Sequence, residues 1–168
     1  MTEGLVESFV GFFRNLDLNK EVIVFIISLL PILELRGGLL AASLLNVDPL
    51  VGYIICVIGN ILPVPFILLL ITPLFNKLKK TKLLSKFVDK IENKALSKKD
   101  QIDKYKYLGL VLFVGIPLPG TGAWTGSLIA CLLNMDKKKS FIAIMLGVIM
   151  ASIIMMIISY GVVGNLIN

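Results

Sequence analysis

Two charged side chains, Glu34 and Arg36, lie inside an otherwise apolar stretch of the chain. Residues 22–33 before them and 39–45 after them carry no charge. A charged side chain at the centre of a bilayer costs about 2.5–3.5 kcal/mol on insertion scales, so such residues mark functional sites. The planar fork of an arginine suits a phosphate or a carboxylate. The pair therefore predicts a site for an anionic group, with Glu34 as a proton-coupling or gating carboxylate. A structural ion pair is the alternative.

The backbone around this pair is predicted to be irregular. Pro31 precedes the pair, and Gly37 and Gly38 follow it; these residue types interrupt helices. Irregular backbone at membrane depth is tolerated only where it is buried in protein or lines a cavity. We therefore expect a hairpin tip at residues 30–38, the first break, with both charged side chains facing such a cavity.

A second break interrupts another apolar stretch with the sequence IPLPGTGAWTG, residues 116–126. It carries no charge, but its prolines prevent a straight helix and its glycines allow close approach and left-handed backbone. Asn60 and a proline kink lie in the apolar segment between the two breaks. The candidate site residues outside the first break are Asn60, Pro117, Pro119, Gly120, Thr121, Gly122 and Thr125. Packing and turn formation are the alternative roles for the glycines.

The composition is that of an integral membrane protein. Of the 168 residues, 57% are hydrophobic and only 17% are charged, and the mean hydropathy is +0.90, whereas soluble domains are about half apolar and a quarter charged. The first twenty residues contain acids and lack a basic start, so we expect no secretory signal peptide. Histidine is absent, and no nucleophile and base stand together. We therefore expect no enzyme activity, no metal and no cofactor.

Helical periodicity and apolar runs divide the expected all-α fold into four parts. An interfacial helix is expected within residues 1–21, because apolar residues recur there at helical spacing. Residues 22–75 contain a broken apolar segment followed by an unbroken one, and residues 108–168 repeat this pattern. Residues 76–107 between them read as a basic amphipathic segment on the cytoplasmic side. Together these parts are expected to form a single membrane domain, residues 1–168.

The two apolar parts are related by an offset of 88 residues. From Pro31 to Leu62, 11 of 32 positions are identical to those 88 residues later. Biased composition explains the aligned leucines and isoleucines, but not the aligned Pro, Gly, Asn and Asp. If each broken segment enters and leaves on one side, the lysines of 77–106 and 137–139 share the cytoplasmic face. We therefore predict an inverted repeat of re-entrant helical hairpin plus transmembrane helix, in preference to four complete spans.

The basic segment between Lys77 and Lys106 has eleven lysines against four acids. In a membrane protein such a cluster is expected to face the anionic headgroups of membrane lipids. No nucleic-acid recognition motif accompanies it, so nucleic acid is not an expected partner. A chain of this size leaves little room to enclose a pathway, so a homodimer is a further expectation.

The two breaks also carry a family resemblance. ELRGG with a preceding proline, and PLPGTGAWTG followed by Ala130, resemble the small multidrug export protein family from about residue 20 to the end. That family looks related to the DedA/VTT group, whose implied fold has two facing re-entrant hairpins. Members of that group are associated with moving phospholipids or lipid-phosphate carriers, often with proton dependence. The resemblance implies that Glu34 matches the acid of the first DedA hairpin. The arginines typical of the second DedA hairpin are missing, and Arg36 is the guanidinium that this chain offers instead.

Together these observations predict a transporter in the cytoplasmic (inner) membrane of a prokaryote. Its expected activity is that of a proton-coupled flippase, scramblase or exporter of lipid-phosphate or other anionic or amphiphilic substrates. The tips of the two hairpins are expected to meet near the midplane, where helix N-termini favour an anionic group. The alternative is a non-transporting membrane scaffold with structural hairpins, whose basic helix docks a partner.

Overall fold

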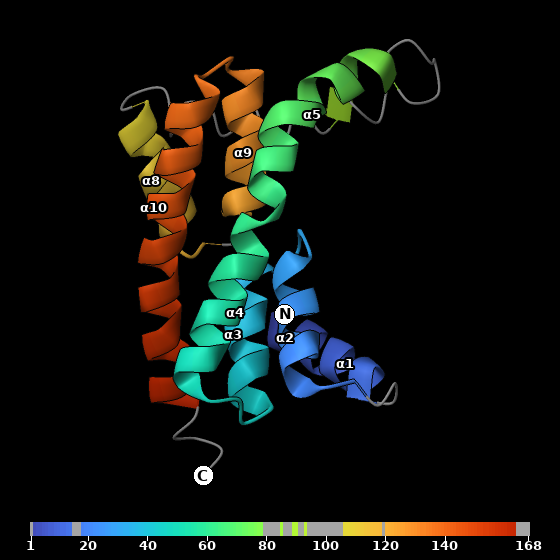
Figure 1. Ribbon diagram of the computed structural model, residues 1–168, viewed down its shortest axis with the longest axis vertical. Coiled ribbons are helices and arrows are strands. Elements are labelled where there is room, and N and C mark those ends of the chain that lie inside the picture. Colours follow the sequence, from blue (N-terminus) through green and yellow to red (C-terminus); the bar gives the residue numbers. More distant parts are fainter. Residues whose placement is uncertain are drawn as a thin grey trace. The chain divides into compact units, whose positions relative to one another are not determined.

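The computed structural model describes residues 2–14, 18–78, 85, 89–90, 93, 106–118 and 120–163. Every regular element within these residues is a helix (Figure 1). The chain divides into two compact units, the first made of Met1–Leu62 with Val148–Asn168 and the second of Pro63–Gly147. The all-α prediction is therefore confirmed for the described part of the chain.

The N-terminal part of the first unit is built from helices that pack on one another. They are α1 (Thr2–Arg14), α2 (Lys20–Leu29), α3 (Glu34–Leu44) and α4 (Pro49–Ile61). α2 packs against α3 and α4, while α1 packs against α2 and α3 (Figure 1). A methyl group added at Gly38 in α3 would overlap the hydroxyl of Ser28 near the end of α2. The chain therefore reverses between α2 and α3, and the two form a helical pair.

Proline chemistry ends α2. The residue before a proline is driven out of the helical region into extended backbone, and Leu30, which precedes Pro31, has φ −71° and ψ 132°. The next helix begins at Glu34, whose φ of 50° is left-handed. The interruption thus covers residues 30–33. Gly37 and Gly38, which we expected to interrupt the helix, lie within α3.

The second unit contains a second helical pair. Its helices are α5 (Pro63–Leu78), α8 (Tyr107–Gly115), α9 (Ala123–Leu132) and the beginning of α10 (Lys137–Met156). α9 packs against both α5 and α8. A methyl group added at Gly126 in α9 would lie 2.6 Å from Cγ2 of Val114 in α8. The device that ends α8 is the same as in the first unit, because Ile116 precedes Pro117 and has φ −83° and ψ 118°.

Both helical pairs end in the same capping structure, 88 residues apart. After α3, Asn46 has φ 50° and its amide donates to the carbonyl of Ser43. After α9, Asn134 has φ 50° and its amide donates to the carbonyl of Cys131. In each case the next amide bonds back to the carbonyl five residues earlier, which completes a Schellman motif. The two halves of the chain therefore stop these helices in the same way.

An aspartate then starts the next helix in each half. Oδ1 of Asp48 accepts hydrogen bonds from the amides of Leu50 at 3.0 Å and Val51 at 3.1 Å. Oδ1 of Asp136 accepts one from the amide of Lys139 at 2.9 Å. Such caps satisfy amides that have no partner within the helix. The repeated sequence Leu-Leu-Asn-x-Asp is thus a helix stop followed by a helix start.

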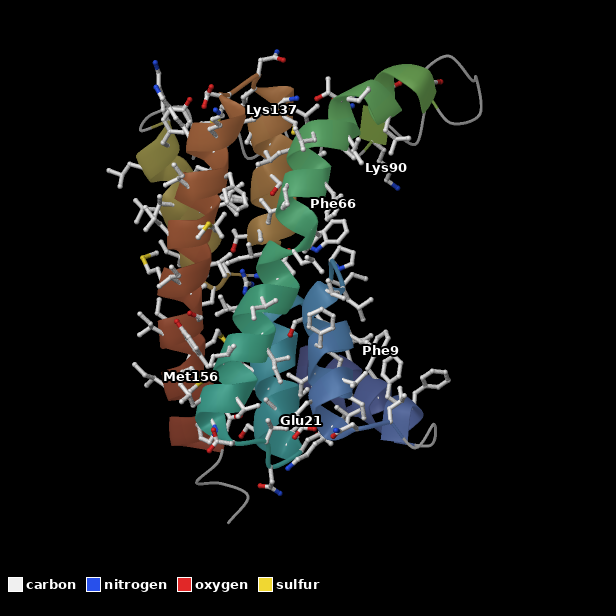
Figure 2. All side chains as sticks on the ribbon, in the orientation of Figure 1. Phe9, Glu21, Phe66, Lys90, Lys137 and Met156 are labelled. Atoms are coloured by element: carbon white, nitrogen blue, oxygen red, sulfur yellow. The ribbon has the colours of Figure 1, made fainter. Side chains whose placement is uncertain are left out.

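Two long apolar helical stretches each begin in one unit and end in the other. Pro49–Leu74 and Lys137–Gly161 are long and apolar enough to cross a membrane. The first stretch contains α4 of the first unit and α5 of the second. The other begins with α10 in the second unit and continues as the π-helical turn η1 (Ile157–Val163), which packs against α3 in the first unit. Apolar side chains such as Phe66 on α5 are exposed along these stretches (Figure 2), as in a lipid-facing surface.

The terminal and basic parts are described incompletely. The helix expected near the N-terminus is present as α1, in which Val6 and Val10 are buried. Most of the basic segment, including its expected apolar face, lies outside the described residues. Of its described residues, Ser85, Asp89, Lys90 and Asn93 are helical, and Lys90 is exposed (Figure 2).

Candidate functional site

Glu34 combines burial, charge and an unusual backbone. It is the first residue of α3, is only 6% exposed, and its amide donates to the carbonyl of Leu30 at 2.8 Å. Its φ of 50° is left-handed. For a residue other than glycine such a conformation costs of order 1–3 kcal/mol, and it persists only where the surrounding structure imposes it. Such positions are often functional, so this geometry adds a reason to single out Glu34.

Arg36 lies in the first turn of α3 and is half-buried. It interacts electrostatically with Glu34. Residues two apart on a helix do not face each other, so a direct pairing along a regular helix is not the default. The two charges nevertheless share one turn at the start of a helix that is otherwise apolar or small in sequence.

Gly37 and Gly38 serve close packing. A methyl group at Gly37 would lie 2.6 Å from Cβ of Leu33. At Gly38 it would overlap the Ser28 hydroxyl and lie 2.8 Å from Sγ of Cys56 in α4. These glycines let α2, α3 and α4 approach directly behind the charged turn.

Asn60, near the end of α4, is 2% exposed, and its amide oxygen Oδ1 has no hydrogen-bond partner. Its place relative to α3 follows from the register of the two helices. A methyl group at Gly52 would lie 3.0 Å from Cβ of Ala42, and one at Gly38 would lie 2.8 Å from Sγ of Cys56. Glu34 comes four residues before Gly38 in α3, and Asn60 comes four residues after Cys56 in α4. The same register therefore sets Asn60 at the level of Glu34.

The candidate residues of the second break lie in the loop between α8 and α9 and in the first turn of α9. Pro117 and Thr121 are half-buried, and Gly120 is exposed with φ 79°. Gly122 caps α9 with φ 143°, and Thr125 is half-buried in the first turn. Pro119 lies outside the described residues. The structure therefore places these residues together within the second unit, and Glu34, Arg36 and Asn60 together within the first.

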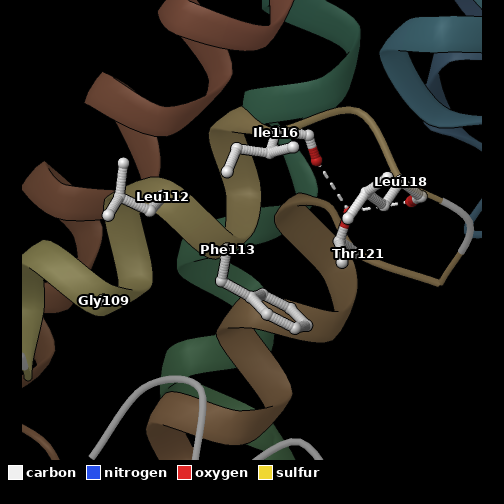
Figure 3. A pocket seen from close by; sticks show the side chains of 6 residues that line it. All are labelled: Gly109, Leu112, Phe113, Ile116, Leu118 and Thr121. Atoms are coloured by element: carbon white, nitrogen blue, oxygen red, sulfur yellow. Dashed lines mark hydrogen bonds between the residues drawn. The ribbon is translucent and has the colours of Figure 1, made fainter. Parts of the chain in front are cut away.

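A pocket of about 220 Å³ lies beside the second break (Figure 3). It is lined by Gly109, Leu112, Phe113, Ile116, Leu118 and Thr121. The Thr121 hydroxyl is directed to the loop backbone, with Oγ1 2.8 Å from the carbonyl oxygen of Leu118 and 3.0 Å from that of Ile116. The remaining lining is apolar, so the pocket suits a methylene chain or a small ring. Its walls from α8 were missed in the sequence, because they resemble ordinary lipid-facing residues.

A polar cluster at the other end of α3 was also missed. Oγ of Ser43 donates to the carbonyl of Ser159 at 2.9 Å, and the Tyr160 hydroxyl donates to the carbonyl of Val47 at 3.1 Å. These bonds hold η1 against the end of α3. A π-helical turn often marks a functional site. The signal available in the sequence was a serine and a tyrosine in the last apolar segment.

The family of the chain follows from comparison with known proteins. A family model described as "putative small multi-drug export protein" matches residues 34–154. The chain belongs to this family. The matched range begins at Glu34, contains every candidate site residue in both units, and ends within α10. Neither the curated proteins nor the solved structures include a match to this chain.

Membership in the small multi-drug export family agrees with the fold. The chain is a membrane protein by composition, by its two apolar helical stretches and by the family to which it belongs. The relationship to the DedA/VTT group stays a prediction, as do the roles of the individual site residues.

Proposed function

We propose that this member of the small multi-drug export family is a transporter that moves an amphiphilic molecule across the membrane. The observation that carries the proposal is Glu34. A carboxylate that is 6% exposed, has left-handed backbone and lies in an apolar helical pair is expensive to maintain. A role in substrate binding or proton coupling explains why the protein has a buried carboxylate here despite this cost in stability.

The two charges of the first break have different roles in this proposal. Arg36 engages an acidic group of the substrate, because its planar fork matches phosphate and carboxylate. Glu34 takes up and releases a proton, which couples movement to the proton gradient. For a lipid substrate the activity is that of a flippase or scramblase, as the proposed kinship with the DedA/VTT group suggests. For a soluble amphiphile it is export.

An inverted repeat of re-entrant hairpins is part of the same proposal. α2 and α3 have 10 and 11 residues, so each is about 15 Å long at 1.5 Å per residue and is too short to cross a core of about 30 Å. Two further features support the repeat: the matching caps 88 residues apart, and the two long helices that run from one unit to the other in opposite chain directions. Lysines gather on the cytoplasmic side of membrane proteins, so the proposal places the basic segment there, facing the anionic lipids of an inner membrane.

Transport by purified protein in liposomes tests the proposal. Probes are acyl-labelled fluorescent phospholipids for lipid movement and a fluorescent alkyl phosphate, an anionic single-chain amphiphile, for export under an imposed pH gradient. We expect Glu34→Gln and Arg36→Ala to lower the rate at least about tenfold, the effect of losing one charged hydrogen bond, with unchanged thermal unfolding. Glu7→Gln, which removes an exposed acid on α1, is the matched control and should transport normally.

The outcomes separate the candidate roles. If both variants keep the full rate, the site is wrong even if the protein transports. If the natural chain moves neither class of probe, transport is refuted and the scaffold alternative gains. That alternative requires partner binding that is lost when the lysines between 77 and 106 are neutralised.

A further inference from the structure

The end of α4 concentrates hydrogen-bond acceptors beside Glu34. Asn60 Oδ1 is buried and has no hydrogen-bond partner. Pro63 has no amide N–H, so the carbonyl of Gly59 lacks the donor that a continuous helix would supply, and Pro65 does the same to the carbonyl of Ile61. The register of α3 and α4, read from the contacts at Gly38 and Gly52, sets residue Glu34 at this same level. Acceptors therefore gather at the level of the charged turn that begins α3.

Neighbouring polar groups in the first unit leave the Asn60 oxygen unsatisfied. The hydroxyl of Ser28, the polar residue of α2 nearest this level, donates to the carbonyl of Val24 at 2.8 Å in its own helix. A buried acceptor without a donor costs about 1–3 kcal/mol, and no water is available in the hydrocarbon region to offset this. A bound molecule that brings its own N–H groups would recover that cost, and a positive charge on it would complement Glu34.

We propose that Asn60 is a further substrate-binding residue, whose amide oxygen accepts a hydrogen bond from an ammonium group of the transported amphiphile while Glu34 supplies the opposite charge. This inference rests on the proposed transport function and names its substrate class. The ammonium carries N–H donors and belongs to a primary-amine lipid headgroup or to a single-chain amine. An ammonium phospholipid would present its phosphate to Arg36 in the same site.

Paired probes that differ in N–H donors test this assignment. In the lipid arm, acyl-labelled phosphatidylethanolamine is compared with acyl-labelled phosphatidylcholine, whose trimethylammonium has no N–H. In the single-chain arm, dodecylammonium is compared with dodecyltrimethylammonium. Each result is the ratio of the two rates in one preparation of reconstituted protein. A variant that merely folds less well lowers both rates and leaves this ratio unchanged.

We expect the natural chain to favour the N–H-bearing probe by about tenfold or more, the range for one hydrogen bond to a charged group. Asn60→Leu, of similar volume but without the acceptor, should bring the ratio near one. Asn60→Asp keeps an acceptor and should retain the preference. Ser127→Ala removes a buried hydroxyl that bonds only within its own helix and is the control.

A preference in the lipid arm assigns the ammonium to a headgroup, and a preference in the single-chain arm assigns it to a free amine. A ratio near one in both arms for the natural chain, or a preference that survives Asn60→Leu, overturns the role of Asn60 while transport itself stands. If the natural chain moves no probe in either arm, both the inference and the proposed function fail.

Discussion

At the scale of single residues, Glu34 combines a buried carboxyl side chain with left-handed backbone. Three positions can be recognised from the sequence because each is polar in an apolar segment: Glu34, Arg36 and Asn60. The left-handed φ of Glu34 had no signal, because glutamate rarely adopts it. Gly37 and Gly38 were expected to interrupt the helix, yet they are helical, and the neighbours that require Gly38 to be small lie on α2 and α4.

The strain at Glu34 leads to a prediction on stability. In a regular helix alanine is more stabilising than glycine by about 1 kcal/mol, but at positive φ the order reverses by about 1–2 kcal/mol, since glycine has no Cβ. Glu34→Gly should therefore unfold at a higher temperature than Glu34→Ala. At the exposed helical position Val22 the alanine variant should be the more stable. Thermal unfolding in detergent, followed by Trp124 fluorescence, shows which of the glycine and alanine variants is more stable at each position. If alanine is the more stable at both positions, the backbone strain at Glu34 is refuted.

At the scale of helices, much of the architecture was present in the sequence. The repeated Leu-Leu-Asn-x-Asp predicts a stop and a start because asparagine tolerates left-handed backbone and aspartate caps helices. The sequence offset of 88 paired Pro31 with Pro119. Leu30 and Ile116 instead end their helices in the same extended conformation, which makes Pro117 the structural equivalent of Pro31. The second break is thus two residues longer, and a constant offset could not reveal this.

Close helix contacts at matching glycines lead to a second stability prediction. A methyl group at Gly59 would lie 2.9 Å from Cβ of Ser28, and one at Gly147 would lie 2.9 Å from the carbonyl oxygen of Val111. Gly59→Ala and Gly147→Ala should each lower the free energy of unfolding by about 1–3 kcal/mol, since overpacking forces the helices apart. Gly11 in α1 has open space around it, so Gly11→Ala should leave stability unchanged or raise it by up to about 1 kcal/mol. Equal effects at all three positions would contradict tight packing at the first two. Denaturant titration in a mixed micelle measures them.

At the scale of the whole chain, the two units share one construction. The first unit holds the pair α2 and α3, then α4, and η1 from the end of the chain. The second unit holds the pair α8 and α9, then the beginning of α10, and α5 from the first half. Position 43 illustrates this. Ser43 bonds to the carbonyl of Ser159, and Cys131, 88 residues later, places its thiol 3.7 Å from the carbonyl of Ile67. The sequence showed the identities at an offset of 88 but not that each unit is completed by the end of a helix from the other half, because these contacts join segments more than 60 residues apart.

The side of the membrane on which each connection lies tests the proposed inverted repeat. If both helical pairs enter and leave on one side, the α3–α4 turn faces outward and the α9–α10 turn, with its lysines, faces the cytoplasm. Asp48 caps α4, so its exposed neighbour Pro49 and the exposed Lys138 are the better positions for single cysteines, in a chain with Cys56→Ala and Cys131→Ala. A membrane-impermeant maleimide should label Pro49→Cys from outside and Lys138→Cys only in inverted vesicles. Labelling of both from one side indicates four complete spans and removes the re-entrant hairpins. Labelling of Lys138→Cys from outside contradicts the charge rule on which the orientation rests.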